Sequence, residues 1–169
     1  MSSKQLFHID EFGPGVDESL IRSIYKINQS NTPEVGELKS IKKMTDLIKL
    51  ASKNIAIRNN NEIIGFAVCF RENSKYQSLN YKHISLLKNK FLYIDRVAIK
   101  KSYTRSGIGT AAYKLLFEYA DSNKLPIFCE VNIKPINKPS LDFHKKNGFI
   151  QIGEKDFSDH SVAYFERQL

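Results

Sequence analysis

The fold is decided by the stretch Phe91-Leu-Tyr-Ile-Asp-Arg-Val-Ala-Ile99, followed by Lys100-Lys-Ser-Tyr-Thr-Arg-Ser-Gly-Ile-Gly-Thr110. Its first half is apolar and β-branched, which predicts a buried strand, and its second half is a basic, glycine-containing loop. An amphipathic helix is expected over residues 107–122. Glycines let a backbone approach a ligand closely, and the free N–H groups of a helix's first turn attract anions. This order of parts predicts a phosphate or pyrophosphate site, with added positive charge from Lys100, Lys101 and Arg105.

The composition is that of an ordinary globular protein. The chain has 169 residues, of which 41% are hydrophobic and 26% are charged, so residues 1–169 are expected to form a single domain. No apolar run approaches the ~20 residues that a membrane-spanning helix needs, and the N-terminus lacks the apolar core of a secretory signal. We therefore expect a cytoplasmic protein without a membrane partner.

Charge and cysteine content argue against two further classes of site. The net charge is +8, but the 26 Lys and Arg residues are scattered along the chain, so we expect no specific nucleic-acid binding. Cys69 and Cys129 lie in apolar, strand-like runs and lack the spacing of a metal site. They are expected to be buried thiols, and no metal is expected.

Hydrophobic periodicity and turn signals divide the chain into strands and helices. We expect strands over residues 5–9, 54–58, 62–70, 91–99, 127–133, 149–152 and 161–167, and helices over residues 17–28, 39–52, 107–122 and 139–146. Residues 76–90 show no clean periodicity and are expected to form a loop. The resulting order, βααβββαβαββ, predicts an α/β (α+β) fold with a mixed central sheet and helices on both faces.

Two motifs resemble those of the GNAT acyltransferase superfamily. Thr104-Arg-Ser-Gly-Ile-Gly109 stands where that superfamily has Gln/Arg-x-x-Gly-x-Gly/Ala between a strand and a helix. Downstream, Asn137-Lys-Pro-Ser-Leu-Asp-Phe-His-Lys-Lys-Asn-Gly-Phe149 is similar to its Asn-x-x-Ala-x-x-Leu-Tyr-x-x-x-Gly-Phe signature. The runs at residues 93–97 and 129–132 further resemble a group of uncharacterised bacterial acetyltransferases.

The resemblance implies that acetyl-CoA is the cosubstrate, with its pyrophosphate on the glycine loop. One departure stands in that loop, since Thr104 replaces the usual Gln or Arg and Arg105 follows one residue later. Backbone N–H groups supply much of the binding in this family, so we expect the site to be kept. The residues that the resemblance places around acetyl-CoA are Val97, Ala98, Ile99, Thr104, Arg105, Ser106, Gly107, Ile108, Gly109, Thr110, Asn132, Asn137 and Phe143.

The resemblance also implies where the chemistry takes place. The strand over residues 91–99 is expected to carry a bulge and to diverge from the strand over residues 127–133, with the Val97 N–H facing the thioester carbonyl. The acceptor amine attacks directly, and Asp95 or Glu130 removes its proton. Asp95 has an alternative, structural role as a partner of neighbouring Arg96.

His144 stands where many family members have the tyrosine that protonates the leaving thiolate. An imidazole, with an ordinary pKa of about 6.5, can donate this proton when it is charged; the alternative is a packing role. Tyr93, from the cofactor strand, and Tyr81, from the expected loop before it, are the candidate acceptor-binding residues.

The function implied by the resemblance is acetyl transfer to a primary amine of a small molecule or peptide. Two alternatives stay open: an acyltransferase that uses a different acyl-CoA, and an acyl-CoA-binding sensor that does not catalyse. The sensor alternative stays open because Thr104 replaces the usual Gln or Arg and residue 144 is not a tyrosine. The sequence also leaves a homodimer open.

Overall fold

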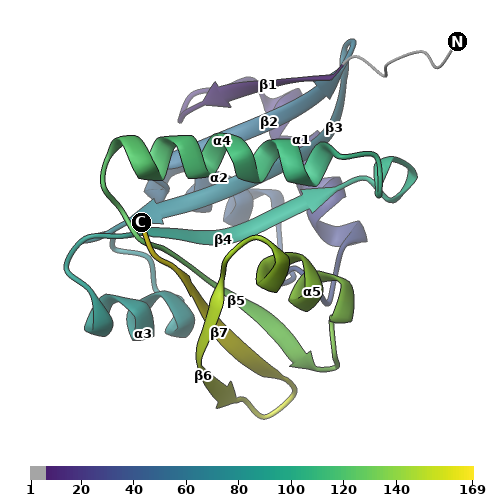
Figure 1. Cartoon of the computed structure of the whole chain (residues 1–169). Coiled ribbons are helices and arrows are strands. Elements are labelled where there is room, and N and C mark those ends of the chain that lie inside the picture. The colour runs from purple at the N-terminus through teal and green to yellow at the C-terminus, as the bar shows by residue number, and fades with distance from the viewer. Residues whose placement is uncertain (1–6) are drawn as a thin grey trace, which may run out of the picture.

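The computed structural model describes residues 7–169, whose seven strands form one mixed sheet (Figure 1). The strand order is β1-β2-β3-β4-β5-β7-β6, in which β4 and β5 are parallel and the other neighbours are antiparallel. The strands are β1 (Phe7–Phe12), β2 (Lys53–Asn59), β3 (Glu62–Arg71), β4 (Leu92–Ile99), β5 (Ile127–Lys134), β6 (Ile150–Asp156) and β7 (Ser161–Arg167). The predicted α/β (α+β) class with a mixed central sheet is confirmed.

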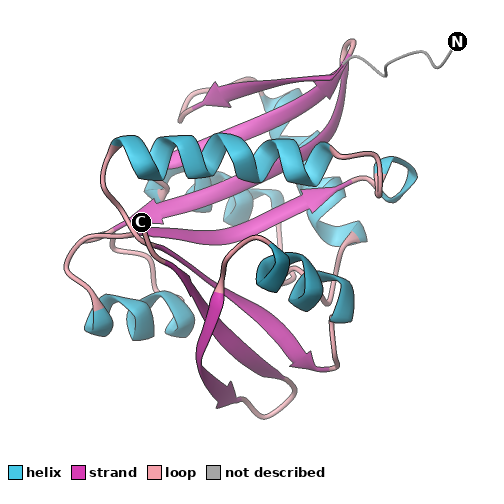
Figure 2. Cartoon of the chain, in the orientation of Figure 1, coloured by secondary structure: helices cyan, strands magenta, loops and turns pink. Residues whose placement is uncertain are grey.

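Five helices of the described residues cover both faces of this sheet, as predicted (Figure 2). They are α1 (Glu18–Ser30), α2 (Ile41–Leu50), α3 (Leu79–Leu87), α4 (Ile108–Ser122) and α5 (Lys138–Lys146), and a short 3-10 turn, η1 (Lys101–Tyr103), precedes α4. Helices α1, α2 and α3 pack on one face, and α4 and α5 pack on the other. Asp17 and Ser40 cap α1 and α2 by accepting backbone N–H groups of the first turn, which fixes where these helices begin.

Alternation along the central strands separates two hydrophobic cores. In β3, Phe66, Val68 and Phe70 belong to the core beneath α1 and α2, whereas Ala67 and Cys69 belong to the core beneath α4. All five side chains are fully buried. A strand that is covered on both faces needs apolar residues at every position, which explains why this segment is a continuous apolar run.

Strand β4 carries the predicted bulge and diverges from β5 as expected. Ile94 and Arg96 pair with consecutive residues of β3, so Asp95 is the extra residue. On its other side, β4 pairs with β5 only through Leu92 and Tyr93. Beyond these two residues the strands separate, as Figure 1 shows, and a gap opens in the middle of the sheet.

The structure corrects the prediction between β3 and β4. The expected loop over residues 76–90 contains helix α3, so the element order is βααββαβαβαββ. Ser78 caps this helix by accepting the Tyr81 N–H. Only Tyr81 and Ile84 are buried, while Leu86 is 85% exposed, so α3 lacks the apolar stripe that predicts a helix.

Two strands are longer than expected. Strand β1 continues past Ile9 to Phe12, and β6 continues past Ile152 to Asp156. Both are edge strands in which at least half of the residues are exposed, so hydrophobic alternation marks only part of each. The first two residues of the predicted first strand, 5 and 6, lie outside the described residues.

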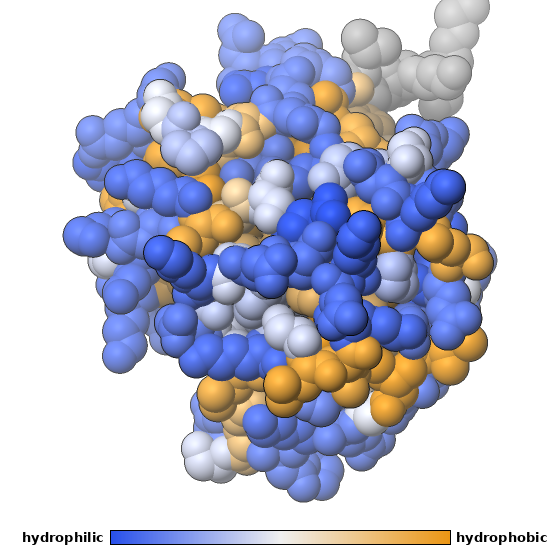
Figure 3. All heavy atoms as spheres, turned by 90° about the vertical axis from the view of Figure 1, so that its left-hand side faces the viewer, coloured by the Kyte–Doolittle hydropathy of each residue, from blue (hydrophilic) through white to orange (hydrophobic). Residues whose placement is uncertain are grey.

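Figure 3 shows the side of the molecule that carries α3. Most of this surface is hydrophilic, and an apolar band crosses its lower part. Helix α3 contributes three exposed apolar side chains, Leu79, Leu86 and Leu87. Within residues 7–169, no helix combines the length and hydrophobicity that crossing a bilayer requires.

Candidate active site

A cavity of about 650 Å³ opens where β4 and β5 diverge. Its walls include Tyr76 and Glu130 on the face covered by α1–α3, and Tyr113 and His144 on the face covered by α4 and α5. Loop residues 32–37, between α1 and α2, complete the wall. Because the gap joins both faces, groups on either side of the sheet can reach a ligand that lies in it.

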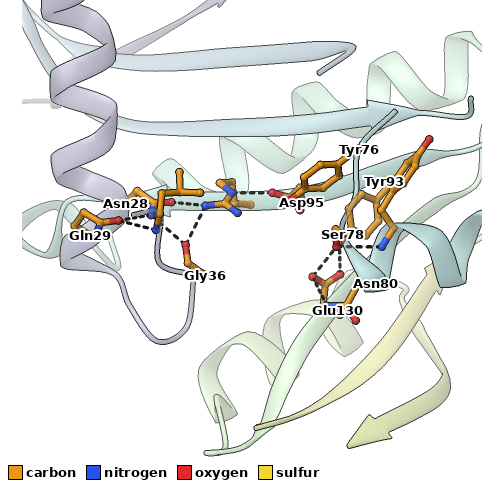
Figure 4. A network of polar contacts seen from close by, with 12 residues as sticks. Asn28, Gln29, Gly36, Tyr76, Ser78, Asn80, Tyr93, Asp95 and Glu130 are labelled. Atoms are coloured by element: carbon orange, nitrogen blue, oxygen red, sulfur yellow. Dashed lines mark hydrogen bonds and ion pairs between the residues drawn. The ribbon is translucent and has the colours of Figure 1, made fainter. Parts of the chain in front are cut away.

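Glu130 lies on β5, and its carboxyl group contacts uncharged donors. The Tyr93 hydroxyl donates to it at 2.8 Å and Asn80 Nδ2 donates at 3.2 Å (Figure 4). Burial, together with the negative charge of Asp95, raises the pKa of Glu130 to about 8. A carboxyl group with this pKa can bind and release a proton close to neutral pH, which suits a general base.

Asp95, in contrast, is neutralised by a neighbouring cation. Arg96 Nε donates to its carboxylate at 2.7 Å, and the Tyr76 hydroxyl donates at 2.9 Å. Arg96 Nη1 also donates to Asn28 Oδ1 at 2.7 Å and to the Gly36 carbonyl at 3.0 Å (Figure 4). Because of the bulge, the consecutive residues Asp95 and Arg96 point to the same face of the sheet, the one covered by α1. Their hydrogen bonds tie β4 to α1, which favours a structural role for Asp95 as the partner of Arg96.

His144 and Tyr113 form a buried pair on the opposite face. His144 Nδ1 lies 2.7 Å from the Ser140 carbonyl, which can only accept, so Nδ1 carries the proton of the neutral ring. His144 Nε2 then accepts from the Tyr113 hydroxyl at 2.9 Å. Burial lowers the pKa of His144, so the neutral ring predominates at neutral pH. The pair thus places a hydrogen-bonded phenol at the cavity wall.

The glycine loop leaves the start of α4 open. Gly107 precedes the helix with φ = 81°, and nothing lies within 4 Å of the position that a Cβ would occupy. No side chain caps α4, so the N–H groups of its first turn are free for a ligand. Lys101 and Arg105 are exposed nearby, whereas Lys100 pairs with Glu62. This combination fits an anionic group such as a pyrophosphate.

The remaining loop residues present mainly their backbone. The Thr104 and Ser106 hydroxyls donate to carbonyls three residues earlier in the chain, so they hold the shape of the loop. Ile108, the first residue of α4, has its side chain buried in the core beneath this helix, and Gly109 and Thr110 continue the first turn. A threonine at residue 104 is therefore compatible with an anion site that depends on backbone N–H groups.

Alternate residues of β4 face the gap with their backbone. The Lys100 N–H bonds a β3 carbonyl at 2.8 Å, and alternation directs the backbone of Ala98 toward β3 as well. Val97 and Ile99 face the gap, although the Ile99 carbonyl accepts from Asn31 at 3.2 Å. The expectation that Ala98 contacts the cosubstrate is corrected, because its side chain is also buried in the core.

Three other predicted cofactor residues lie at or behind the cavity wall. Asn132 Nδ2 donates at 3.0 Å to a carbonyl of the 32–37 loop, and Asn137 caps α5; both line the cavity. Phe143 packs edge-on against Tyr113, with ring centroids 4.8 Å apart. Each asparagine therefore combines a structural hydrogen bond with a position beside a ligand.

The two tyrosines expected at the acceptor site lie in the core. Tyr81 is 3% exposed, and its hydroxyl donates to the Arg71 carbonyl at 2.7 Å. The prediction that Tyr81 binds the acceptor is therefore wrong, since α3 turns the ring inward among other aromatic rings, away from the cavity wall. Tyr93 is fully buried and reaches the site only through its hydrogen bond to Glu130.

The sequence interpretation missed Tyr113 and two loops of the cavity wall. Tyr113 interrupts an apolar helix face, and a buried phenol needs a hydrogen-bond partner, which is the one signal that could have marked it. The loop at residues 32–37 and the β6–β7 turn, with Asp159 and His160, reach the cavity only through tertiary folding. No local pattern indicates their role.

Comparison with known proteins gives consistent results. A profile of the acetyltransferase (GNAT) family matches residues 21–149. The ribosomal-protein-S18-alanine N-acetyltransferase from Escherichia coli has a similar structure, with a TM-score of 0.69 and 14% identity, over 96% of this chain and 93% of that one. Arabidopsis thaliana NAA60 in complex with acetyl-CoA gives a TM-score of 0.72 and 16% identity, over 97% and 100%. A search of curated protein sequences finds no match.

The family match carries more weight than the structural likeness. At these identities the similar structures support the fold alone. The family profile, in contrast, spans most of the chain and includes the glycine loop, the diverging strands and the motif around His144. The chain therefore belongs to the acetyltransferase (GNAT) family.

Proposed function

We propose that this protein transfers an acetyl group from acetyl-CoA to a primary amine of a small molecule or peptide, by direct attack of the amine. One observation carries the proposal: the gap between β4 and β5 has Glu130 on one face and the Tyr113–His144 pair on the other. Acetyl transfer needs both, because the amine loses a proton while the thiolate gains one.

Acetyl-CoA is the cosubstrate, and it supplies the acetyl group as a thioester. The free N–H groups at the start of α4, with Lys101 and Arg105 beside them, fit its pyrophosphate. We place Val97 and Ile99 along its pantetheine arm, because their backbone groups face the gap. The Val97 N–H is then the donor that stabilises negative charge on the carbonyl oxygen.

Glu130 is the general base in this mechanism. Its pKa of about 8 is close to the ordinary pKa of about 8 for an α-amino group, so transfer of the ammonium proton to Glu130 costs little. Asp95 is less suited, because its carboxylate is already paired with Arg96. We therefore assign Asp95 a positioning role, in which it holds the bulge against α1.

We assign protonation of the leaving thiolate to His144, acting through Tyr113. The Tyr113 hydroxyl passes its proton to the sulfur as the C–S bond of the thioester breaks, and neutral His144 then takes a proton from solvent at Nε2 and passes it to the Tyr113 oxygen. The ring ends neutral, with its proton on Nδ1, as its hydrogen bonds describe it. The 2.9 Å contact between the two side chains supports this route.

Direct attack is favoured over transfer through a cysteine. Cys129 lines the cavity, but burial raises the pKa of its thiol well above the ordinary value. The thiolate, which is the nucleophilic form, is therefore scarce. The buried carboxyl group of Glu130 also favours an enzyme over a sensor, because binding an acyl-CoA does not require a base.

The experiment that tests this function is a thiol-release assay with acetyl-CoA and a panel of monoamines, diamines, amino acids and peptides. Peptides are included because the similar structures include the ribosomal-protein-S18-alanine N-acetyltransferase and the NatC complex bound to Gag peptide and CoA. Mass spectrometry should find the acetylated amine. Propionyl-CoA and succinyl-CoA test the acyl preference. Absence of thiol release with every amine, although acetyl-CoA raises the melting temperature, would leave the sensor as the function.

A further inference from the structure

The charge of the cavity is opposite in sign to that of the chain. Five carboxyl groups line it against one guanidinium, whereas the whole chain carries a net charge of +8. The carboxyl groups are those of Glu34, Glu37, Asp95, Glu130 and Asp159, and the guanidinium is that of Arg96. They come from the α1–α2 loop, β4, β5 and the β6–β7 turn, so folding gathers them from separate segments.

Three of these carboxyl groups have no cationic partner within residues 7–169. Asp95 is paired with Arg96, and Asp159 contacts His160 at 2.7 Å. Glu130 bonds only uncharged donors. Glu34 and Glu37, both exposed, form no ion pair there. At neutral pH the cavity therefore holds the negative charge of Glu34 and Glu37, which the described part of the chain does not neutralise, and Glu130 adds its own charge when it loses its proton near pH 8.

This charge does not serve the cosubstrate. Acetyl-CoA is a polyanion, and its pyrophosphate fits the open start of α4 beside Lys101 and Arg105. A cleft lined by charge of one sign concentrates ligands of the opposite sign, so the carboxyl groups serve the acceptor. An acceptor with a single ammonium group would pair only with Glu130. Glu34 and Glu37, on a different element, are left to contact a second positive charge.

We propose that the acceptor is an amine that carries at least one further positive charge. Its reacting nitrogen lies beside Glu130, and its second cationic group lies beside Glu34 and Glu37. An aliphatic diamine and a peptide with a basic residue next to its free N-terminus share this chemistry. The proposal rests on the proposed acetyl transfer and names the class of acceptor for the same cavity.

Matched pairs of acceptors test this class. The first pair is 1,5-diaminopentane and pentylamine, which have the same chain length and differ in the second ammonium group. The second pair is two peptides that differ only in having lysine or norleucine next to the free N-terminus. We expect the dicationic member of at least one pair to have a kcat/KM about tenfold higher, with the preference falling as salt is added. The pair that shows the preference identifies the source of the amine.

Charge-removing variants locate the preference within the cavity. Glu34→Gln combined with Glu37→Gln should reduce the preference for the dication several-fold. Glu118→Gln combined with Glu154→Gln removes the same charge from exposed sites on α4 and β6, outside the cavity wall, and should not change it. An equal reduction by both double variants would overturn the proposal, because net charge would then explain the preference.

The outcomes separate this proposal from the one on which it rests. Measurable acetyl transfer without a preference for the dication in either pair overturns the acceptor class and leaves the transfer reaction standing. Transfer to no amine at all, with acetyl-CoA binding intact, contradicts the reaction itself.

Discussion

The start of α4 and the α1–α2 loop, which we name the positive end and the negative end of the site, differ in the sign of their charge and in the atoms that carry it. At the start of α4, positive charge comes from backbone N–H groups and from exposed Lys101 and Arg105. At the α1–α2 loop, negative charge comes from Glu34 and Glu37 side chains. An anionic cosubstrate and a cationic acceptor can therefore approach from different sides. The net charge of +8 alone would suggest an anionic acceptor, which is opposite in sign to the acceptor proposed above.

The largest effect is expected on acetyl-CoA binding at Gly107, because backbone N–H groups supply much of the positive charge there. Gly107→Glu should abolish the rise in melting temperature that acetyl-CoA causes, because a carboxylate would stand where the pyrophosphate approaches. Gly15→Glu is the matched control, since Gly15 has φ = 87° and equally open surroundings in a turn before α1. Scanning fluorimetry measures both variants. A normal shift in Gly107→Glu would place acetyl-CoA elsewhere.

The second largest effect is expected on turnover when Glu130, the proposed general base, is replaced. Glu130→Gln should lower kcat by about 10²–10⁴-fold, the usual range for a general base, and should leave the acetyl-CoA shift unchanged. The wild-type kcat/KM should rise with pH through about 8, where Glu130 loses its proton. Glu166→Gln, a buried carboxyl group outside the cavity wall, is the control. Near-normal turnover in Glu130→Gln would return the role to Asp95 or water.

The proton route on the opposite face is tested by two single variants and their combination. His144→Phe and Tyr113→Phe should each lower kcat by about 10²-fold, because both members are needed for one transfer. The double variant should be little worse than either single one, as expected for residues that act as a unit. His144→Tyr should recover part of the loss. If both single variants turn over normally, the pair has only a packing role.

A smaller effect, on the KM for acetyl-CoA, is expected when the side chains of Lys101 and Arg105 are removed. Lys101→Ala combined with Arg105→Ala should raise the KM for acetyl-CoA about tenfold and leave kcat nearly unchanged, since these charges contact remote phosphates throughout the reaction. Lys145→Ala with Lys146→Ala removes the same charge from α5 and should change neither constant. A fall in kcat alone would show that the loop takes part in the chemistry.

The smallest effect is on stability. The pKa of Glu130 is about 8 in the folded chain against an ordinary value of 4.5, so the unfolded chain releases this proton first as pH rises. Between these values Glu130 increasingly destabilises the fold, and the cost levels off above pH 8. Glu130→Gln should therefore melt roughly 5 °C or more above wild type at pH 8.5 and close to it at pH 5. Parallel melting curves that keep a constant difference across this range would contradict the raised pKa.

The sequence predicted best those features that depend on neighbouring residues. The strand, glycine loop and helix at residues 91–122 are contiguous, and their hydrophobic pattern and turn residues are enough to place them. The choice between Asp95 and Glu130 could not be made in the same way. It depends on which carboxyl group meets Arg96 and which meets only uncharged donors, and those partners come from distant segments.

Segments with weak local patterns account for most of the errors. Helix α3 buries only Tyr81 and Ile84, so its apolar residues do not form a stripe, and the inward direction of Tyr81 could not be foreseen. Glu34 and Asp159 lie in loops far apart in the sequence, and the fold brings both to the wall of one cavity. The acidic lining is therefore a property of the fold and not of any motif.

The bulge at Asp95 makes the active site sensitive to whether the residue count in β4 is odd or even. Tyr93 and Ala98 lie in the same core, although an odd interval in a regular strand would put them on opposite faces. If the same residues formed a regular strand without the bulge, one half of β4 would be turned over, and Tyr93 and Ala98 would lie on opposite faces. Every chemical group would still be present, but the residues assigned to the amine and those assigned to acetyl-CoA would no longer lie on their present sides.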